Sequence, residues 1–431
     1  MKTHVFCTFL FALLIASAAG AGDIAAPLTL DTALQRFRTR AFDLIIAETA
    51  IASAEADVTV ASAVANPSLS LSRGKSSTYD PSLCPGCSNT STSAGLTDQG
   101  AISDLLSGKR RLRTEVANAA LEATKRSRAD VERTLEFTLK QLLLQAELAK
   151  RNLGYAHDAL RLSTDTLALV NTRYKAGAIS EADVARAEVQ KLEAEQSVNI
   201  AELTLATGKA GLAYLLAYDG PPPTLDVSDD LIREAAAARV RTLSADELLQ
   251  RAVAQRPDLA AAGFQTRRAR ASVDLARRLR IPDVLPSLQY SQEGRGQNAI
   301  QPPTITFGFS STLPAFYRYR GEIAHAEAEL RTQETAQAKV TAQIRSDVAS
   351  SLAAVASAAA RTERMQQLLG RAARARDLVR LQYEKGAASL FEFLDAQRTY
   401  LGIQSESLQT LNDYWTAVFQ MEQAAGVELH Q

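Results

Sequence analysis

Two carboxylates near the end of the chain have a spacing that could do chemistry. Glu392 and Asp395 lie three residues apart in a stretch rich in helix formers, so both side chains share one face of the expected helix. Assembly of several chains around an axis would gather these pairs into an acidic ring that attracts cations and responds to pH and to divalent ions. A structural role competes with this one. Ser389 and Glu392 have the Ser-x-x-Glu spacing of a capping box, and Ser180 and Asp183 come close to it.

The remaining reactive residue types form no catalytic pattern. The four histidines, at 4, 157, 325 and 430, are scattered, and the sequence contains no zinc-protease motif, phosphate-binding glycine loop or nucleophile elbow. We therefore expect a protein that is not an enzyme and holds no cofactor or metal. Cys84 and Cys87 lie in a polar loop, where the pair fits a local disulfide, free thiols, or a metal or redox site. A structural zinc site is disfavoured because it needs four ligands.

Composition excludes several other classes of protein. The 431 residues include 48 Lys plus Arg and 48 Asp plus Glu, so the chain lacks the cationic excess that nucleic-acid binding requires. Apolar residues make up 46% and charged residues 22%, a balance typical of folded chains. The length allows one or two large structural units.

The first twenty residues have the order of an export signal. Lys2 is followed by an apolar core at 9–15 and then by small residues, with cleavage expected between 18 and 20. This apolar run is shorter than the roughly 20 residues of a membrane-spanning helix. The mature chain is therefore expected to enter a membrane only as β-strands. Cys7 would leave with the signal, so we expect no lipid-bearing cysteine at the mature N-terminus.

Proline-free stretches predict long helices. Residues 86–220 and 315–431 lack proline and are rich in strong helix formers. In the second stretch a mostly apolar heptad seam is formed by Leu390, Leu394, Gln397, Leu401, Gln404, Leu408, Leu411, Trp415 and Val418. In the first stretch the expected seam has smaller residues, namely Ala185, Val189, Leu192, Gln196, Asn199, Leu203, Ala206 and Ala210. Helices of this length must pack along other helices.

The two halves of the sequence resemble each other. The segment that begins at Arg113 recurs at Arg320, 207 residues later, and the segment that begins at Tyr174 recurs at Tyr383, 209 residues later. Near-constant separations in one order along the chain indicate a tandem duplication. Each repeat reads as helix, strand, loop, strand, long helix, turn and helix. We predict a signal peptide at 1–20, a first repeat at 21–220, a linker at 221–242 and a second repeat at 243–431.

Four short segments alternate apolar and small polar residues, the pattern of strands with one apolar face. They are residues 68–72, 92–102, 287–291 and 304–310, of which 92–102 alternates least clearly. Such strands fit either a barrel with lipid outside and water inside, or a hairpin packed against the helices. In lipid, four strands cannot close a barrel, whose smallest common form has about eight, and open edges are not tolerated. Several copies of the chain must then share one barrel, which the helices extend as a conduit.

Short motifs along almost the whole mature chain resemble the TolC-type outer-membrane efflux channel family. In the family's order they are Asn66-Pro67-Ser68-Leu69, Arg256-Pro257-Asp258-Leu259, the Tyr-x-x-Gly turns at 174–177 and 383–386, and Leu394-Asp395-Ala396-Gln397-Arg398. Two further stretches, 280–283 and 320–324, most resemble the CzcC-like heavy-metal-cation branch of that family.

The resemblance implies a mainly α fold with a β-barrel part. Long helices from the tandem repeat would form a periplasmic tunnel, and four strands per chain would join a 12-stranded barrel of a homotrimer in contact with outer-membrane lipid. It implies a passive duct for small solutes, heavy-metal cations among them. The duct would work with a periplasmic adaptor protein and an inner-membrane pump, first of all one of the resistance-nodulation-division type. Drugs and other organic compounds, or secreted polypeptides, are alternative cargoes. A soluble periplasmic coiled-coil adaptor or scaffold is the alternative function.

The resemblance also implies roles for residues at the helix-hairpin turns. The residues expected at the constriction that gates the tunnel are Tyr383, Glu392, Asp395 and Asp183. Gly177 and Gly386, whose positions suit helix ends with a left-handed backbone, would lie at the hairpin tips that meet the adaptor. Ala388 stands where relatives have a basic residue, so a salt bridge at the gate is not expected from this position.

Overall fold

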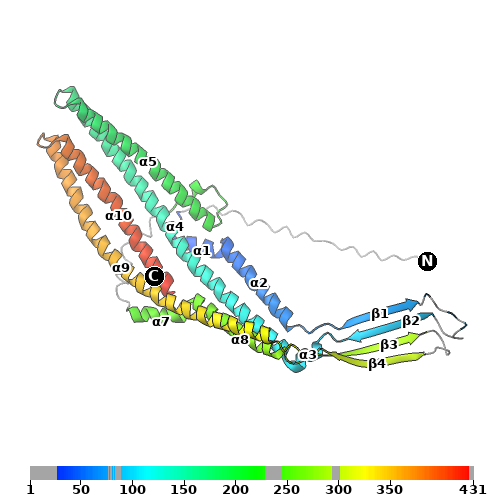
Figure 1. Ribbon diagram of the computed structural model, residues 1–431. Helices are drawn as coiled ribbons and strands as arrows, with labels where there is room; N and C mark the ends of the chain where they lie inside the picture. The colour runs from blue at the N-terminus through cyan, green and yellow to red at the C-terminus, as the bar shows by residue number, and fades with distance from the viewer. Residues whose placement is uncertain are drawn as a thin grey trace, which may run out of the picture. The chain divides into compact units, whose positions relative to one another are not determined.

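The computed structural model describes residues 27–75, 77, 80, 82, 89–228, 244–293 and 301–426. These residues form long helices and one four-stranded antiparallel sheet, which confirms the expected mixture of elements (Figure 1). The chain divides into two compact units, Met1–Phe37 with Gln145–Leu231, and Arg38–Leu144 with Ile232–Gln431. The expected signal peptide at 1–20 and both Cys84 and Cys87 lie outside the described residues, as does much of the expected linker. The predicted repeat boundaries stay a prediction.

The first unit has a small apolar core beside the end of a helical hairpin. Its elements are the first part of α1 (Leu30–Arg40), the second part of α4 (Lys109–Lys175), α5 (Glu181–Leu215) and the 3-10 helix η1 (Pro222–Thr224). Phe37, Leu212 and Val227 are fully buried in this core. The Arg36 guanidinium donates to the carbonyl oxygens of Leu216 and Ala217, at 3.1 and 3.2 Å. These bonds satisfy carbonyl groups that the end of α5 leaves without helical partners.

The second unit contains the sheet and most of the long helices. Its helices are the first part of α4, α2 (Phe42–Ser62), α3 (Ala101–Ser107), α7 (Ala245–Gln255), α8 (Pro257–Arg278), α9 (Arg320–Glu384) and α10 (Leu390–Ala425). α4 has 67 residues and α9 has 65, which confirms the expected long helices. None of the described helices is both long enough and apolar enough to cross a membrane.

The sheet presents one apolar face and one polar face. It consists of β1 (Ser68–Lys75), β2 (Thr90–Thr97), β3 (Val284–Glu293) and β4 (Gln301–Ser311) in that order. The pairing register aligns one apolar row across all four strands, made of Leu69, Leu96, Leu288 and Phe307. The facing row of small or polar residues is made of Ser70, Gly95, Gln289 and Thr306. The apolar row is 40–82% exposed, so the described helices do not cover it.

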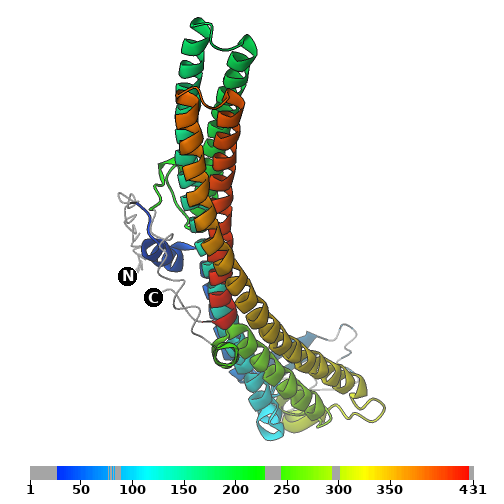
Figure 2. The ribbon, with the colours of Figure 1, turned by 90° about the vertical axis from the view of Figure 1, so that its left-hand side faces the viewer.

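α9 and α10 form an antiparallel hairpin, and α8 lies along the first part of α9 (Figure 2). Val273 and Ala276 of α8 pack against Ile323 and Ala326 of α9. The seam expected on α10 is confirmed, because none of its nine residues is exposed. At its base, the rings of Trp415 and Phe419 lie 5.8 Å apart.

The seam expected on α5 was wrong for this chain. All eight of its residues are exposed, with Leu192 and Leu203 at 62% and 65%. The covered stripe instead carries small residues one heptad apart, namely Ala187, Ala194 and Ala201, which are buried, and Gly208, which is half-buried. A Cβ atom added at Gly208 would lie 3.6 Å from the Ala146 Cα of α4, so only small residues permit this approach. α5 has two apolar stripes, and the stripe with the smaller side chains is the one that packs against α4.

Candidate functional site: helix-hairpin tips and an acidic helix face

The turn between α9 and α10 is a Schellman motif. Ala387 N–H donates to the Gln382 carbonyl at 2.8 Å, and Gly386 N–H donates to the Tyr383 carbonyl at 3.0 Å. Gly386 has φ +80°, a left-handed conformation that a side chain would strain. The expected helix-ending role of this glycine is confirmed. Whether an adaptor contacts the turn stays a prediction.

Glu392 forms a capping box with Ser389 at the start of α10. The Ser389 N–H donates to the Glu392 carboxylate at 2.7 Å, and the Glu392 N–H donates back to the Ser389 hydroxyl at 3.2 Å. The backbone hydrogen bond from Ser389, followed by the one from its hydroxyl, lowers the pKa of Glu392. The Glu392 carboxylate therefore already has a structural partner at the helix start. The capping alternative is confirmed as a contact of Glu392.

Asp395 lies one helical turn beyond the capping box and is exposed. Its position on α10 is three residues after Glu392, so the two carboxylates share one face of the helix. Since Glu392 is turned back toward the Ser389 backbone, Asp395 is the carboxylate of the pair that can project from the hairpin. A ring of carboxylates built from several chains would depend chiefly on this residue.

Tyr383 is packed inside the hairpin. Its side chain is 1% exposed, and its ring stacks on that of Phe393 at 5.3 Å with an angle of 11° between the planes. An offset stack of this kind locks the last turn of α9 onto the first turn of α10. In this chain the Tyr383 ring supports the tip from within. Its expected place at the tunnel constriction stays a prediction.

The turn between α4 and α5 repeats the same local geometry. Ala178 N–H donates to the Arg173 carbonyl at 3.0 Å, and Gly177 has φ +74°. The Ser180 hydroxyl and backbone N–H donate to the Asp183 carboxylate at 2.8 and 3.2 Å. The hydroxyl bond is the main cause of a lowered Asp183 pKa, and Arg186 adds an ion pair at 3.2 Å. Asp183 is thus a capping carboxylate too, and its role at a gate stays a prediction.

The seam of α10 includes a buried amide close to the acidic face, and its lack of hydrogen-bond partners within the described part of the chain was not expected from the sequence. Gln397 is fully buried in the seam of α10, and neither polar atom of its side chain has a hydrogen-bond partner among the described residues. The heptad spacing marked this position, but its burial could not be separated from that of an ordinary polar seam residue. A buried amide without partners costs about 1–3 kcal/mol.

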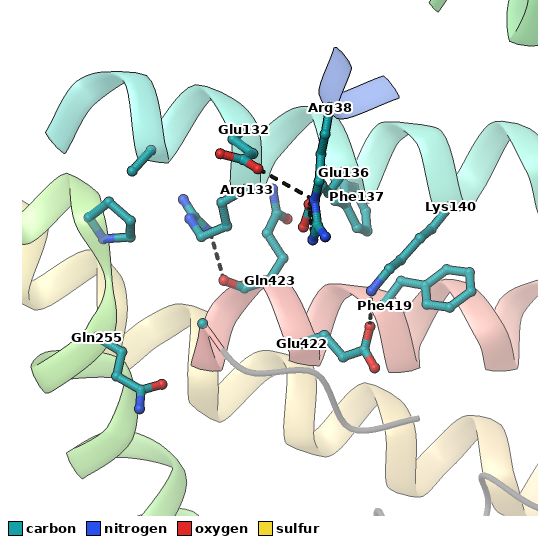
Figure 3. A pocket seen from close by; sticks show the side chains of 13 residues that line it. Arg38, Glu132, Arg133, Glu136, Phe137, Lys140, Gln255, Phe419, Glu422 and Gln423 are labelled. Atoms are coloured by element: carbon teal, nitrogen blue, oxygen red, sulfur yellow. Dashed lines mark hydrogen bonds and ion pairs between the residues drawn. The ribbon is translucent and has the colours of Figure 1, made fainter. Parts of the chain in front are cut away.

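Sequence reasoning also missed a charged cavity of about 280 Å³ between α4, α10 and the end of α1 (Figure 3). Lys140 Nζ lies 2.8 Å from Glu422 Oε2, and both side chains are nearly buried, at 6% and 5% exposed. Arg38 pairs with Glu136 at 2.7 Å, and the Arg133 guanidinium donates to the Gln423 carbonyl at 2.6 Å. The charged groups pair with one another, and the contacts of Lys140 and Arg133 across the cavity hold α10 against α4.

The Arg-Pro-Asp motif at 256–258 has a structural explanation. The nearly buried Arg256 guanidinium contacts Asp258 at 2.6 Å and Asp347 of α9 at 2.9 Å. Pro257 opens α8, where its missing N–H costs nothing. Burial alone would raise the pKa of Asp258, but the hydrogen bond and charge of Arg256 outweigh burial and lower it. The motif fixes the joint between α7, α8 and α9.

No group of three or more His, Cys, Asp or Glu side chains that could hold a metal ion occurs in the part of the chain that the structure describes. At the tips, Glu392 and Asp183 cap their helices, and Asp395 is exposed.

Comparisons with known proteins agree with this architecture. The model of the outer membrane efflux protein family matches residues 33–217 and 248–427. The chain is 25% identical over 396 residues to the cobalt-zinc-cadmium resistance protein CzcC of Cupriavidus metallidurans, covering 90% of this chain and 89% of that protein. It is 26% identical over 392 residues to the pyoverdine export outer membrane protein OpmQ of Pseudomonas aeruginosa, covering 88% and 81%. The crystal structure of CusC superposes with a TM-score of 0.75 at 19% identity, covering 93% of this chain and 92% of that one.

This chain, with long helical hairpins joined to a four-stranded sheet, thus shares the fold of the transmembrane channel protein CusC. The chain belongs to the outer membrane efflux protein family. It is an outer-membrane efflux channel with a large helical portion in the periplasm, and channels of this family function with an adaptor and an inner-membrane pump in tripartite systems. As predicted, it is a channel rather than an enzyme.

Proposed function

We propose that three copies of this chain form a passive duct, with a shared 12-stranded barrel in the outer membrane and a helical tunnel in the periplasm. The observation that carries the proposal is the sheet, whose apolar rows are exposed on one face while Ser, Thr, Gly and Gln occupy the other. This is the alternation of a barrel strand with lipid outside and water inside.

The sheet edges supply the reason for more than one copy. β1 and β4 are the outer strands of the four-stranded sheet, so each has one side without a partner strand among the described residues. Unpaired backbone groups are too costly in hydrocarbon, and four strands are too few to close a barrel. Joining β4 of one copy to β1 of the next removes both edges. A soluble scaffold would instead expose the Leu69 to Phe307 row to water.

At the periplasmic end, we propose that Asp395 from each copy forms an acidic ring at the constriction, with Glu392 and Asp183 capping their helices close to the hairpin turns. Asp395 is the carboxylate that no capping contact occupies, and its charge would attract cations and repel its own copies. The adaptor is proposed to dock on the turns at Gly177 and Gly386. Tyr383 would support the constriction from inside its hairpin.

For the cargo, we propose small solutes with heavy-metal cations as the first candidates, driven by a pump of the resistance-nodulation-division type. The similarity to CzcC, a cobalt-zinc-cadmium resistance protein, supports this choice, and so does an acidic constriction. A similar identity to OpmQ, a pyoverdine export protein, keeps organic cargo in the test. A deletion strain should become sensitive to cobalt, zinc or cadmium; unchanged metal tolerance with a defect in siderophore export would replace the metal proposal with an organic one.

The duct itself is tested in planar lipid bilayers with the detergent-extracted protein. We expect steady ion conductance that divalent cations block, and we expect Asp395→Ala to raise the conductance or weaken the block. Glu406→Ala is the matched control, because it removes one carboxylate from the exposed surface of the same helix three turns away. An Asp395→Ala channel with the conductance and block of the parent would refute the gate. Release of the protein by osmotic shock, without detergent, would refute the duct.

A further inference from the structure

The short helix α3 has its apolar and polar sides reversed. Ser103 and Ser107 are buried, whereas Leu105 and Leu106 are 71% and 81% exposed. The burial of Ser103 has a clear cause, since its hydroxyl donates to the Val284 carbonyl and accepts from the Val284 N–H, both at 2.6 Å. α3 is therefore held against the start of β3 by its polar side. Its leucines point away from the protein.

The matching segment of the second repeat has the same character. Leu313 lies 207 residues after Leu106, the separation that relates Arg113 to Arg320, and it is 71% exposed. Phe316 is completely exposed. This connection is fixed at its far end, where the Tyr317 hydroxyl donates to Glu322 at 2.7 Å and accepts from Gly321 N–H at 3.0 Å.

Both segments lie at the same end of the sheet. Val284, which contacts α3, is paired in the sheet with Ser311, and Ser311 precedes Leu313 by two residues. The exposed side chains Ile102, Leu105, Leu106, Leu313 and Phe316 therefore all lie at the end of the sheet that adjoins the helices. We call these five residues the apolar collar.

The sheet is too short to cover the lipid core by itself. On β3, apolar side chains on the lipid-facing side run from Val284 to Tyr290, six steps or about 20 Å along the strand. A strand tilted by about 40° covers about 15 Å of height, compared with an apolar band about 25 Å tall in barrels of this kind. Toward the other end, the next row begins with Arg73 and Thr92, so the band does not extend that way in the described strands.

Charged residues follow the collar in the order that a membrane surface requires. Arg111 lies five residues after Leu106, and Arg318 and Arg320 lie two and four residues after Phe316; all three are exposed. Apolar side chains followed by arginines match the step from acyl chains to lipid phosphates. An interface with another protein chain would not need this order.

We propose that the apolar collar lies in the acyl chains of the periplasmic leaflet, with Arg111, Arg318 and Arg320 at the lipid phosphates, so that helical residues complete the lipid-facing band. The inference rests on the proposed barrel, because the collar continues its outer face. Phe316 is the aromatic anchor at this level.

Bromine-labelled lipids test the proposal through tryptophan fluorescence. The chain has a single tryptophan, Trp415, so a Trp415→Phe background makes any new tryptophan the sole reporter. Phe316→Trp and Leu106→Trp place the reporter in the collar, and Phe307→Trp places it on the sheet. Phe391→Trp is the aqueous control, because Phe391 is 67% exposed at a hairpin tip. If Trp415→Phe impairs folding, the same differences can be measured with Trp415 retained as a constant background.

In vesicles with bromine on the acyl chains, the fluorescence of the collar reporters should be quenched to the same extent as that of Phe307→Trp. Iodide, a quencher dissolved in the water, should not reduce their fluorescence. Phe391→Trp should be quenched by iodide and not by the brominated lipid. Collar reporters quenched by iodide would overturn the proposal. Collar reporters reached by neither quencher would also overturn it, since a neighbouring copy would then cover them. In either case a quenched Phe307→Trp leaves the barrel intact. An unquenched Phe307→Trp would instead refute the barrel itself.

Discussion

Loss of the Glu422 carboxylate is expected to loosen the junction between α4 and α10 by several kcal/mol. Lys140 Nζ lies 2.8 Å from Glu422 Oε2, and the two side chains are 6% and 5% exposed (Figure 3). Glu422→Gln removes the ion-pair partner of an ammonium group that water hardly reaches. Breaking a buried pair from one side costs about 3–5 kcal/mol. Since 1.36 kcal/mol is a factor of ten, the local opening equilibrium should rise roughly 100- to 5,000-fold.

Hydrogen exchange measures this opening without requiring reversible unfolding of the whole channel. Faster exchange is expected for the amides of Tyr414–Ala425, while those of Leu390–Gln397 at the far end of α10 keep their rates. Glu115→Gln is the matched control, because its ion pair with Arg111 is 55% and 71% exposed and is worth at most about 1 kcal/mol.

The paired variant Lys140→Met with Glu422→Leu separates charge from packing. Replacing both partners of a buried pair with apolar groups is commonly neutral or stabilising. The double variant should therefore regain most of the protection that Glu422→Gln loses. The reasoning is refuted if Glu422→Gln exchanges like the parent, or if the double variant is as open as the single one.

Three further predictions concern stability. Gln397→Leu should stabilise the α9–α10 hairpin by about 1–3 kcal/mol, since it removes a buried amide without partners; slower exchange near residue 397 would show it, and faster exchange would contradict it. Gly386→Ala should lower the free energy of unfolding by about 1 kcal/mol, because Gly386 has a φ of +80°. Gly402→Ala, whose added methyl group would lie in open space on α10, should raise the free energy of unfolding by about 0.5–1 kcal/mol. Thermal melts in which both variants shift in the same direction would disprove this prediction. The pKa of Asp258 is lowered in the folded state, so its contact with Arg256 contributes to the stability of the fold. This contribution is complete above pH 3.8, the ordinary pKa of an aspartate, and is lost as the pH falls below that value. In thermal melts, the melting temperature of Asp258→Asn should lack the acid-dependent decrease that Asp258 causes in the parent. A melting temperature that depends on pH as it does in the parent would contradict this prediction.

Local patterns were sufficient to predict the long helices, both turns and three of the four strands, whereas the strand expected at 92–102 was wrong at its end, because β2 stops at Thr97 and α3 begins at Ala101. Period-two alternation predicted the strands at 68–72 and 304–310, and the glycines at 177 and 386 occupy the left-handed positions expected of them. These features depend on backbone preferences of neighbouring residues, so the sequence contains the information directly. The capping boxes at Ser180 and Ser389 are of the same kind.

Contacts between distant segments could not be read from the sequence. Lys140 and Glu422 are 282 residues apart, and nothing in either local pattern distinguishes them from surface charges. The burial of Tyr383 likewise depends on the packing of its ring against Phe393 across the turn. Such pairs are defined only once the helices are placed, so the sequence did not show that the ring at 383 packs inside its hairpin.

The error on α5 bears on how the channel assembles. A helix with two apolar stripes can bury only one against a single neighbour, and the small stripe from Ala187 to Gly208 is covered in this chain. The other stripe, with Val189, Leu192, Ile200 and Leu203 at 55–65% exposed, remains uncovered. In the part of the chain that the structure describes, β1 and β4 are likewise left with one unpaired side each. A sheet edge needs backbone partners and a helix stripe needs apolar contact, so these are independent requirements. Assembly with further copies meets both, whereas a monomer meets neither.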